Sequence, residues 1–270
     1  MQPELEIGPL TLQTFGIMFA LGFVAAGALV GKRLRELGKP ADWAYEMVFA
    51  ALVGGIIGAR IDFIIQNYDS VSDDLFGSIF SGSGLVWFGG LVGGAVGVLL
   101  WAWWRRILNL TLLDVCAPGL AIGYAVGRIG CQVSGDGDYG KARGGPWAMA
   151  YPDGTVPTNQ EVHPTPIYET LAMGLATYVL WRLRDSLRPG LLFALYLVLA
   201  GSERFLVEFI RRNDEVLLGL TQAQLISLAM MFAGGAWLAV KANRGELAAA
   251  PGLRDSPPAR LDPAARPEPL

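Results

Sequence analysis

Residues 110–126 read LTLLDVCAPGLAIGYAV, and residues 127–140 continue as GRIGCQVSGDGDYG. The first segment is apolar and long enough to enter a membrane, whereas the second places an arginine, a cysteine and two aspartates among glycines. Lipid does not tolerate such a polar segment unless protein or a water-filled cavity covers it. We therefore predict that residues 127–140 form one wall of a site for an anionic headgroup at the membrane's edge.

Composition points to a membrane protein. Of the 270 residues, 53% are hydrophobic and 17% are charged, whereas typical soluble chains carry about 25% charged residues. The 35 glycines suit closely packed transmembrane helices, where small residues let backbones approach. The net charge of −3 argues against a nucleic-acid partner, and the two cysteines lack metal-binding or redox spacing.

Seven apolar runs are long enough to span a bilayer as helices. They cover residues 12–30, 43–65, 85–104, 110–126, 166–181, 190–210 and 222–240. The predicted fold is an all-α integral membrane protein with seven transmembrane helices, forming one domain over residues 1–247. Residues 127–165 are rich in glycine, proline and turn pairs, which predicts an external irregular cap. Residues 248–270, rich in proline and alanine, are expected to form a disordered cytoplasmic tail.

The loops predict the orientation, because cytoplasmic loops carry an excess of Lys and Arg. Cations occur in the first, third and fifth connections and after the last run: Lys32, Arg33, Arg35, Lys39, Arg105, Arg106, Arg182, Arg184, Arg188, Lys241 and Arg244. The N-terminus has neither Lys nor Arg, and the second connection carries only the acids Asp69, Asp73 and Asp74. The N-terminus is therefore expected outside and the C-terminus in the cytoplasm.

Ionisable residues at membrane depth are costly and usually serve a function or pair internally. Four places carry them: Arg60 in GARIDF, Arg128, Glu169 in HPTPIYE, and the group Arg204, Glu208 and Arg211 in ERFLVEFIRR. The predicted topology puts all four on the external side. Arginine suits a phosphate because its planar guanidinium donates two parallel hydrogen bonds and stays charged. Together these places predict a cavity for an anionic lipid headgroup.

The helical charges also have plainer interpretations. Arg204 and Glu208 have the i, i+4 spacing of an intrahelical salt bridge, which would only neutralise two buried charges. Arg60 could extend its guanidinium to the membrane interface. The two interpretations remain open for each of these residues.

The loop residues have alternatives as well. His163, the single histidine, is either a general base or a partner in a structural hydrogen bond. Cys131 has no base at a recognisable spacing, so a small packing residue is favoured over a nucleophile. Asp136 and Asp138 either contribute to the site or act only as turn formers in a glycine-rich loop.

Taken in order, these motifs resemble the bacterial phosphatidylglycerol–prolipoprotein diacylglyceryl transferase family over roughly residues 8–240. Four elements carry the resemblance: GARIDF, GLVWFGGLVGG, GRIGCQVSGDGDYG and HPTPIYE, followed by RFLVEFIRR. It implies transfer of a diacylglyceryl group from phosphatidylglycerol to the lipobox cysteine of a preprolipoprotein signal peptide, releasing glycerol phosphate. It implies no metal and no cofactor. It also implies a multi-pass protein of the bacterial inner membrane, expected to be a monomer, with its site toward the periplasm.

The resemblance assigns roles to residues. The expected catalytic residues are Arg128, Arg204, Glu208 and Asp136. The expected phosphatidylglycerol-binding residues are Arg128, Arg204, Arg60, Glu169, Gly140 and Phe88. The two arginines would hold the phosphate and stabilise charge on the leaving group, and Glu208 with Asp136, or Glu169, would orient them. The substrate supplies the thiol nucleophile, so no catalytic cysteine is needed.

Three positions depart from the family's pattern. Phe88 stands where the family commonly has His or Tyr, Cys131 where it commonly has Asn, and Phe15 where it has Tyr before a glycine. Phenylalanine cannot accept a proton, so the base for the substrate thiol is not residue 88. Either a carboxylate or the lipid phosphate takes the proton, or this homologue binds lipid without catalysis or with another acceptor.

Overall fold

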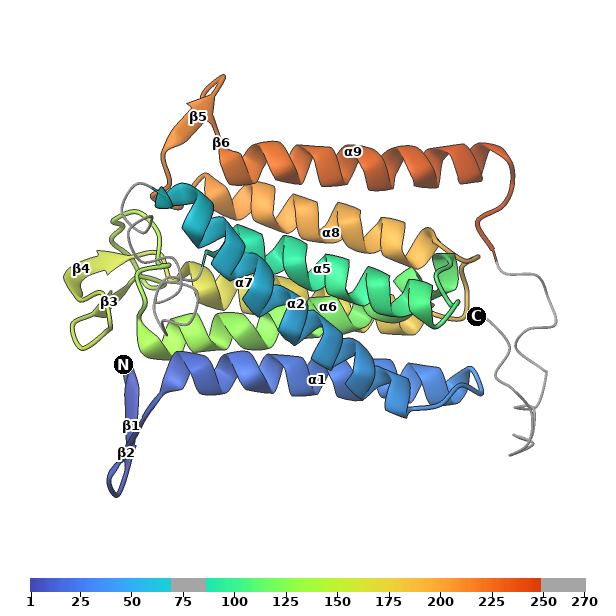
Figure 1. The fold of residues 1–270 in the computed structure, drawn as a ribbon. Coiled ribbons are helices and arrows are strands. Elements are labelled where there is room, and N and C mark those ends of the chain that lie inside the picture. Colours follow the sequence, from blue (N-terminus) through green and yellow to red (C-terminus); the bar gives the residue numbers. More distant parts are fainter. Residues whose placement is uncertain (69–85, 249–270) are drawn as a thin grey trace. The chain divides into compact units, whose positions relative to one another are not determined.

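The structure is a computed structural model that describes residues 1–68 and 86–248 (Figure 1). The described residues contain seven long helices, one at each predicted apolar run. They are α1 (Thr14–Glu36), α2 (Asp42–Gln66), α5 (Trp87–Trp104), α6 (Leu110–Ser134), α7 (Thr165–Leu183), α8 (Leu191–Glu208) and α9 (Gln222–Asn243). The acidic connection with Asp69, Asp73 and Asp74 and the predicted tail from residue 249 onward lie outside the described residues.

Helix α6 ends at Ser134 rather than at residue 126, so the first part of the predicted cap is helical. Glycine at position 130 serves packing here, because a Cβ on Gly130 would lie 2.9 Å from Cβ of Met18 on α1. The helix stops where Gly135 adopts φ +59°, a left-handed conformation that commonly ends helices. Arg128 therefore projects from a rigid helix and not from a loop.

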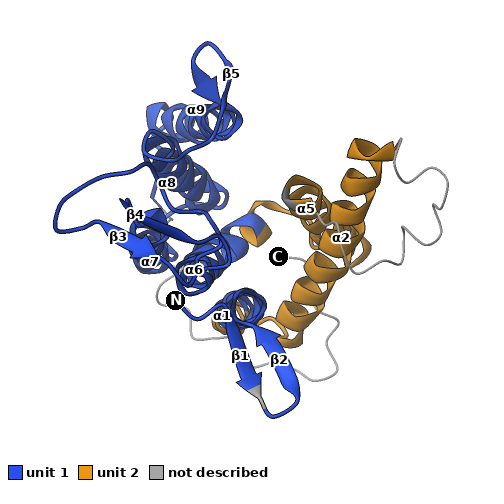
Figure 2. Cartoon of the chain, turned by 90° about the vertical axis from the view of Figure 1, so that its left-hand side faces the viewer, with its two compact units in different colours: residues 1–30, 113–259 blue, residues 31–112, 260–270 orange. Residues whose placement is uncertain are grey.

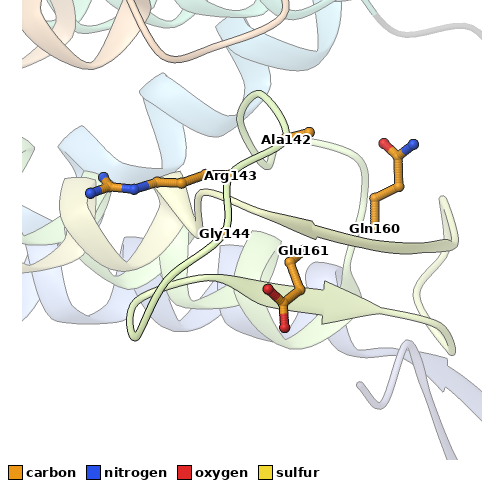
Figure 3. Close-up of a pocket in the computed structure, with 5 residues that line it drawn as sticks. All are labelled: Ala142, Arg143, Gly144, Gln160 and Glu161. Carbon is orange, nitrogen blue, oxygen red and sulfur yellow. The ribbon is translucent and has the colours of Figure 1, made fainter.

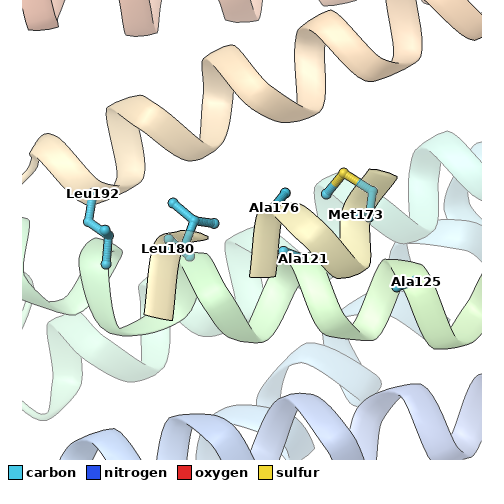
Figure 4. Close-up of a cluster of buried hydrophobic side chains, with 7 residues drawn as sticks. Ala121, Ala125, Met173, Ala176, Leu180 and Leu192 are labelled. Atoms are coloured by element: carbon cyan, nitrogen blue, oxygen red, sulfur yellow. The ribbon is translucent and has the colours of Figure 1, made fainter. Parts of the chain in front are cut away.

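The described residues form two compact units, residues 1–30 with 113–248 and residues 31–68 with 86–112 (Figure 2). In the first unit, α8 packs against α7 and α9. Three alanines one turn apart on α6 belong to one buried cluster with side chains of α7 and α8 (Figure 4). Its members are Ala117, Ala121, Ala125, Met173, Ala176, Leu180 and Leu192. Small residues on α6 allow this close approach of helices.

The start of α8 is tied to α6 by a carboxylate. Asp114 accepts hydrogen bonds from the backbone N–H groups of Gly190 at 2.7 Å and Phe193 at 2.8 Å. A helix N-terminus presents unpaired N–H donors and favours negative charge, so Asp114 satisfies both needs. This contact fixes the helix that carries Arg204 and Glu208.

In the second unit, α2 packs against α5 through glycines on both helices. A Cβ on Gly58 would overlap the backbone of Gly89, and one on Gly93 would overlap that of Gly54. Asp62 of α2 accepts a hydrogen bond from the backbone N–H of Gly89 at 2.9 Å, at the start of α5. The glycines of both helices thus form a close packing face between α2 and α5.

Among the described residues, three short antiparallel hairpins are present in addition to the predicted helices, so the fold is mostly, but not entirely, helical. They are β1 (Glu4–Ile7) with β2 (Leu10–Gln13), β3 (Met149–Tyr151) with β4 (Thr158–Val162), and β5 (Glu215–Leu217) with β6 (Leu220–Thr221). The middle hairpin gives the cap a small core of Tyr139, Tyr151 and Val162, with the tyrosine rings stacked at 4.8 Å between centroids. The Tyr151 hydroxyl donates to Oε1 of Gln132 at 2.9 Å, which fastens the cap to α6.

Four helices among the described residues are long and apolar enough to cross a membrane: α1, α2, α6 and α9. A shorter apolar helix runs from Phe88 to Trp104. Helix α8 is not among these four, and it carries three charged residues, Glu203, Arg204 and Glu208, within its 18 residues. The chain is thus a helical, multi-pass membrane protein, while the count of seven spans stays a prediction.

Candidate active site

Six charged side chains of the first unit form one connected network of ion pairs, which we call the arginine–carboxylate cluster. Its members are Arg128, Asp138, Glu169, Arg204, Glu208 and Arg211. They come from the last turns of α6 and the loop after it, the first turns of α7, and the end of α8. Three arginines face three carboxylates, so the formal charges cancel.

Glu169 is the centre of this cluster. Its side chain is fully buried, and its Oε2 lies 3.0 Å from Nε of Arg128. Its Oε1 lies 3.2 Å from Nη1 of Arg204 and 3.6 Å from Nη1 of Arg211. The Tyr124 hydroxyl donates to the same Oε1 at 3.2 Å. A buried carboxylate costs several kcal/mol unless it is paired, so Glu169 and the arginines depend on one another.

Asp138 connects the loop after α6 to the other elements. Its carboxylate pairs with Arg128 through Oδ2 and with Nη2 of Arg211 through Oδ1 at 2.6 Å. Its backbone carbonyl accepts a hydrogen bond from Oγ1 of Thr165 at 2.6 Å, at the start of α7. Burial acts to raise the pKa of Asp138, but the charges of Arg128 and Arg211 hold it below its ordinary value. Asp138 is therefore a stable anion between two arginines.

Glu208 is held from the start of α9. Its Oε2 lies 2.8 Å from Nη2 of Arg204, one turn earlier on α8. Its Oε1 accepts hydrogen bonds from Nδ2 of Asn213 at 2.6 Å and from Oγ1 of Thr221 at 2.9 Å. Thr221 is also the N-cap of α9, where it forms a capping box with Gln224. The N-cap residue of α9, Thr221, thus orients the Glu208 carboxylate, which in turn positions Arg204.

The three arginines differ in exposure. The side chain of Arg211 is 8% exposed, whereas those of Arg128 and Arg204 are 14% and 23% exposed. Arg128 also lies over the ring of Tyr124, 5.0 Å from its centroid. Two guanidinium groups therefore remain partly accessible while carboxylates fix their geometry, an arrangement that suits a phosphate or another oxyanion.

One group of side chains has the spacing of metal ligands. The ligand atoms of Cys131, Asp136 and Asp138 all lie within 4.8 Å of one another. Asp138, however, already pairs with Arg128 and Arg211. These two positive charges oppose the binding of a cation at the same carboxylate, so the donor set does not favour a metal.

Comparison with known proteins identifies the family. Residues 3–240 match the family described as Prolipoprotein diacylglyceryl transferase. The chain belongs to this family. The resemblance seen in the sequence motifs is confirmed.

Curated relatives carry the name "Phosphatidylglycerol--prolipoprotein diacylglyceryl transferase". One from Dehalococcoides mccartyi is 35% identical over 234 residues, covering 84% of this chain and 88% of the relative. One from Clostridium tetani is 32% identical over 238 residues, covering 87% and 95%. One from Pseudoalteromonas atlantica is 33% identical over 262 residues, covering 90% of each chain.

Four predicted site residues meet in the cluster: Arg128, Glu169, Arg204 and Glu208. The i, i+4 salt bridge between Arg204 and Glu208 also forms, as part of the larger network. The ion pairs expected of Asp136 are instead made by Asp138.

Asp136 occupies a different position in this loop. Its Oδ1 accepts a hydrogen bond from the backbone N–H of Asp138 at 3.2 Å, the local bond of a turn-forming aspartate. Burial raises the pKa of Asp136 above its ordinary value, although a hydrogen bond from the Cys131 thiol acts in the opposite direction. Its predicted catalytic role stays a prediction.

Gly140 lies where the cap, α7 and the end of α8 meet. Its N–H donates to the carbonyl of His163 at 2.8 Å, and a Cβ on it would lie 2.5 Å from the carbonyl oxygen of Ile210. Arg60 and Phe88 belong to the second unit. Arg60 is buried there, 5.2 Å from the ring centroid of Phe63. The lipid contacts predicted for Gly140, Arg60 and Phe88 stay predictions.

Arg211 and Asp138 were named among the candidate residues but were given no individual role. Arg211 follows Glu208 by three residues, a spacing that places both on one helical face. Asp138 was one of two loop aspartates, and the choice between them depends on loop geometry. Asn213 and Thr221, which hold Glu208, were not predicted, because they are ordinary polar residues in sequence.

The cap carries a pocket of its own, lined by Ala142, Arg143, Gly144, Gln160 and Glu161 (Figure 3). His163 follows the same strand. Its Nδ1 is buried and has no hydrogen-bond partner among the described residues. Burial, and then the charge of Arg143, lower the pKa of His163, which favours the neutral imidazole.

Proposed function

We propose that this chain transfers a diacylglyceryl group from phosphatidylglycerol to the lipobox cysteine of a preprolipoprotein. The products are a thioether-linked lipoprotein precursor and glycerol phosphate, so the reaction would begin lipoprotein maturation. The relatives' shared name supports this activity. The observation that carries the proposal is a pair of partly exposed arginines, Arg128 and Arg204, that one buried carboxylate holds together.

In the proposed reaction, Arg128 and Arg204 bind the phosphodiester of phosphatidylglycerol. The substrate thiolate attacks the glyceryl carbon that bears the phosphate, the C–S bond forms, and the C–O bond breaks. Its electrons remain on the departing phosphate, whose extra negative charge the two guanidinium groups stabilise. Glu169 and Glu208 keep both groups oriented, so little reorganisation is needed at the moment of reaction. No step requires a metal or a cofactor.

The proposed topology has seven spans in the inner membrane, with the N-terminus in the periplasm and the C-terminus in the cytoplasm. Alternation of cationic and cation-free loops supports it. The cluster would then face the periplasm, because it lies at the end of α6, the start of α7 and the end of α8. The protein is proposed to act as a monomer on a lipobox-containing signal peptide. Periplasmic labelling of a cysteine introduced at Glu6, without labelling of one introduced at Glu36, would support this orientation.

The activity is tested with purified full-length protein, phosphatidylglycerol vesicles and a synthetic lipobox peptide. Mass spectrometry should detect the diacylglyceryl adduct of the peptide. Arg128→Ala and Arg204→Ala should each lower the transfer rate by about 10²–10³-fold, because each removes a donor that stabilises developing charge.

Arg184→Ala is the matched control. Arg184 has a side chain 22% exposed, close to the 23% of Arg204, but it lies at the other end of α7. Its variant should transfer at the wild-type rate. Wild-type transfer by the two cluster variants would refute the phosphate-binding role. An inactive wild-type protein that retains phosphatidylglycerol would indicate a lipid-binding homologue.

A further inference from the structure

The proposed transfer requires a group that takes the thiol proton, because the thiolate is the nucleophile. A free thiol has a pKa of about 8.5, so only a few per cent is ionised at neutral pH. Each carboxylate of the arginine–carboxylate cluster is already engaged in ion pairs with arginines. His163, the single histidine, lies in the cap and not in the arginine–carboxylate cluster, and the charged residue that acts on it there is Arg143.

Glu203 is a further carboxylate beside the cluster. It precedes Arg204 on α8, and its Oε1 is buried without a hydrogen-bond partner among the described residues. A buried oxygen of this kind costs free energy unless a ligand or a proton satisfies it. Among the glutamates of the site, Glu203 is the one with an oxygen outside both the ion pairs and the hydrogen bonds described above.

Charged groups from α6, α7 and the end of α8 act on Glu203. Glu169 on α7, Arg128 on α6, and Arg204 and Arg211 at the end of α8 all act on its carboxylate. Two tyrosines, Tyr124 on α6 and Tyr196 on α8, lie close enough to interact electrostatically with Glu203. Glu203 is therefore near both a carboxylate and arginines of the cluster, which hold the proposed phosphate.

We propose that Glu203 is the catalytic base of the transfer, and this inference rests on the proposed function. Its ionised carboxylate takes the proton from the lipobox thiol and becomes a carboxylic acid. The thiolate then uses its electron pair to form the C–S bond as the phosphate leaves with the electrons of the C–O bond. The proton returns from Glu203 to the departing glycerol phosphate or to water, which restores the base.

The test compares two peptides that differ in one atom. Glu203→Gln keeps the shape of the side chain and removes the base, so transfer to a cysteine peptide should fall by about 10²–10⁴-fold at neutral pH. A selenocysteine peptide carries a selenol that is already ionised at neutral pH, and transfer to it should stay near the wild-type rate. The residual rate with the cysteine peptide should rise tenfold per pH unit toward the thiol's own pKa of about 8.5.

Matched variants make the result specific. Glu46→Gln removes a carboxylate that pairs with Arg105 in the second unit, and it should behave as wild type with both peptides. Asp136→Asn tests the rival carboxylate near Cys131, and its rates with the two peptides should change by the same factor. If the glutamine variant does not fold, Glu203→Asp receives the same pair of measurements. Its deficit should be larger with cysteine than with selenocysteine.

Three results would overturn the inference. They are a wild-type rate for Glu203→Gln with the cysteine peptide, an equal loss with both peptides, and selenocysteine rescue of Asp136→Asn instead. Failure of the proposed function looks different, because the wild-type protein would then modify neither peptide.

Discussion

Glu169→Gln should destabilise the protein far more than the same substitution at an exposed arginine pair. Glutamine preserves the volume of the side chain but removes its charge, leaving three arginines with the two carboxylates of Asp138 and Glu208. The positive charge left over is buried, since Arg211 and Arg128 have side chains only 8% and 14% exposed. Removing one partner of a buried ion pair typically costs about 3–5 kcal/mol, because the other charge stays desolvated.

Glu46→Gln is the control for this prediction. Its carboxylate lies 2.5 Å from Nη2 of Arg105, but the two side chains are 35% and 38% exposed. Water screens such a pair, so its loss should cost about 0–1 kcal/mol. At roughly 2–4 °C per kcal/mol for a chain of this size, Glu169→Gln should unfold about 6–20 °C below wild type and Glu46→Gln less than about 4 °C below.

The assay is thermal unfolding of the purified variants in one detergent at neutral pH, followed by intrinsic tryptophan fluorescence. Monodispersity before heating shows that each variant has folded. If Glu169→Gln unfolds within the range of Glu46→Gln, the cluster does not depend on its central carboxylate and the reasoning fails.

Three more outcomes follow from the site and its cap. Gly140→Ala should lower the free energy of unfolding by about 1–3 kcal/mol, because its Cβ would meet the Ile210 carbonyl, whereas Gly144→Ala, with open space around it, should have no effect in thermal melts. Cys131→Ala should keep its transfer rate in the mass-spectrometric assay, and an inactive variant would show that this thiol matters to the chemistry. Asp138 has its pKa below the ordinary value of 3.8, so its stabilising contribution is present above that value and lost as the pH falls through the lowered pKa. The difference in melting temperature between wild type and Asp138→Asn should therefore persist from pH 7 to pH 5, and its disappearance by pH 5 would contradict the ion pairs.

The helices were predictable because each apolar run must satisfy its own backbone within lipid, which leaves helix as the available structure. The end of α6 could not be predicted in the same way. Glycine usually signals a break, yet position 130 faces α1, where even a Cβ would clash with Met18, and the helix continues to Ser134. Whether a glycine ends a helix or packs against another helix depends on a neighbour distant in sequence, which the local pattern does not contain.

The cluster was partly predictable for a similar reason. A charge in an apolar run needs a partner, and Arg128, Glu169 and Arg204 all sit near helix ends that the topology brings to one side. The choice of Asp138 over Asp136 as the partner of Arg128 was beyond the sequence. It depends on Gly135 at φ +59° and Gly137 at φ +95°, which turn the chain so that the second aspartate meets Arg128 and Arg211.

Charge balance explains why a neutral cluster can serve the proposed reaction. With Glu203 ionised, the phosphodiester contributes one negative charge, the carboxylate a second, and the thiol none. After the step the carboxylate is protonated, the thioether is neutral, and glycerol phosphate carries both charges. The total stays constant while one negative charge moves from Glu203 to the phosphate held by Arg128 and Arg204. Because the arginines act on both positions, the same fixed positive charges stabilise the anion before and after the transfer.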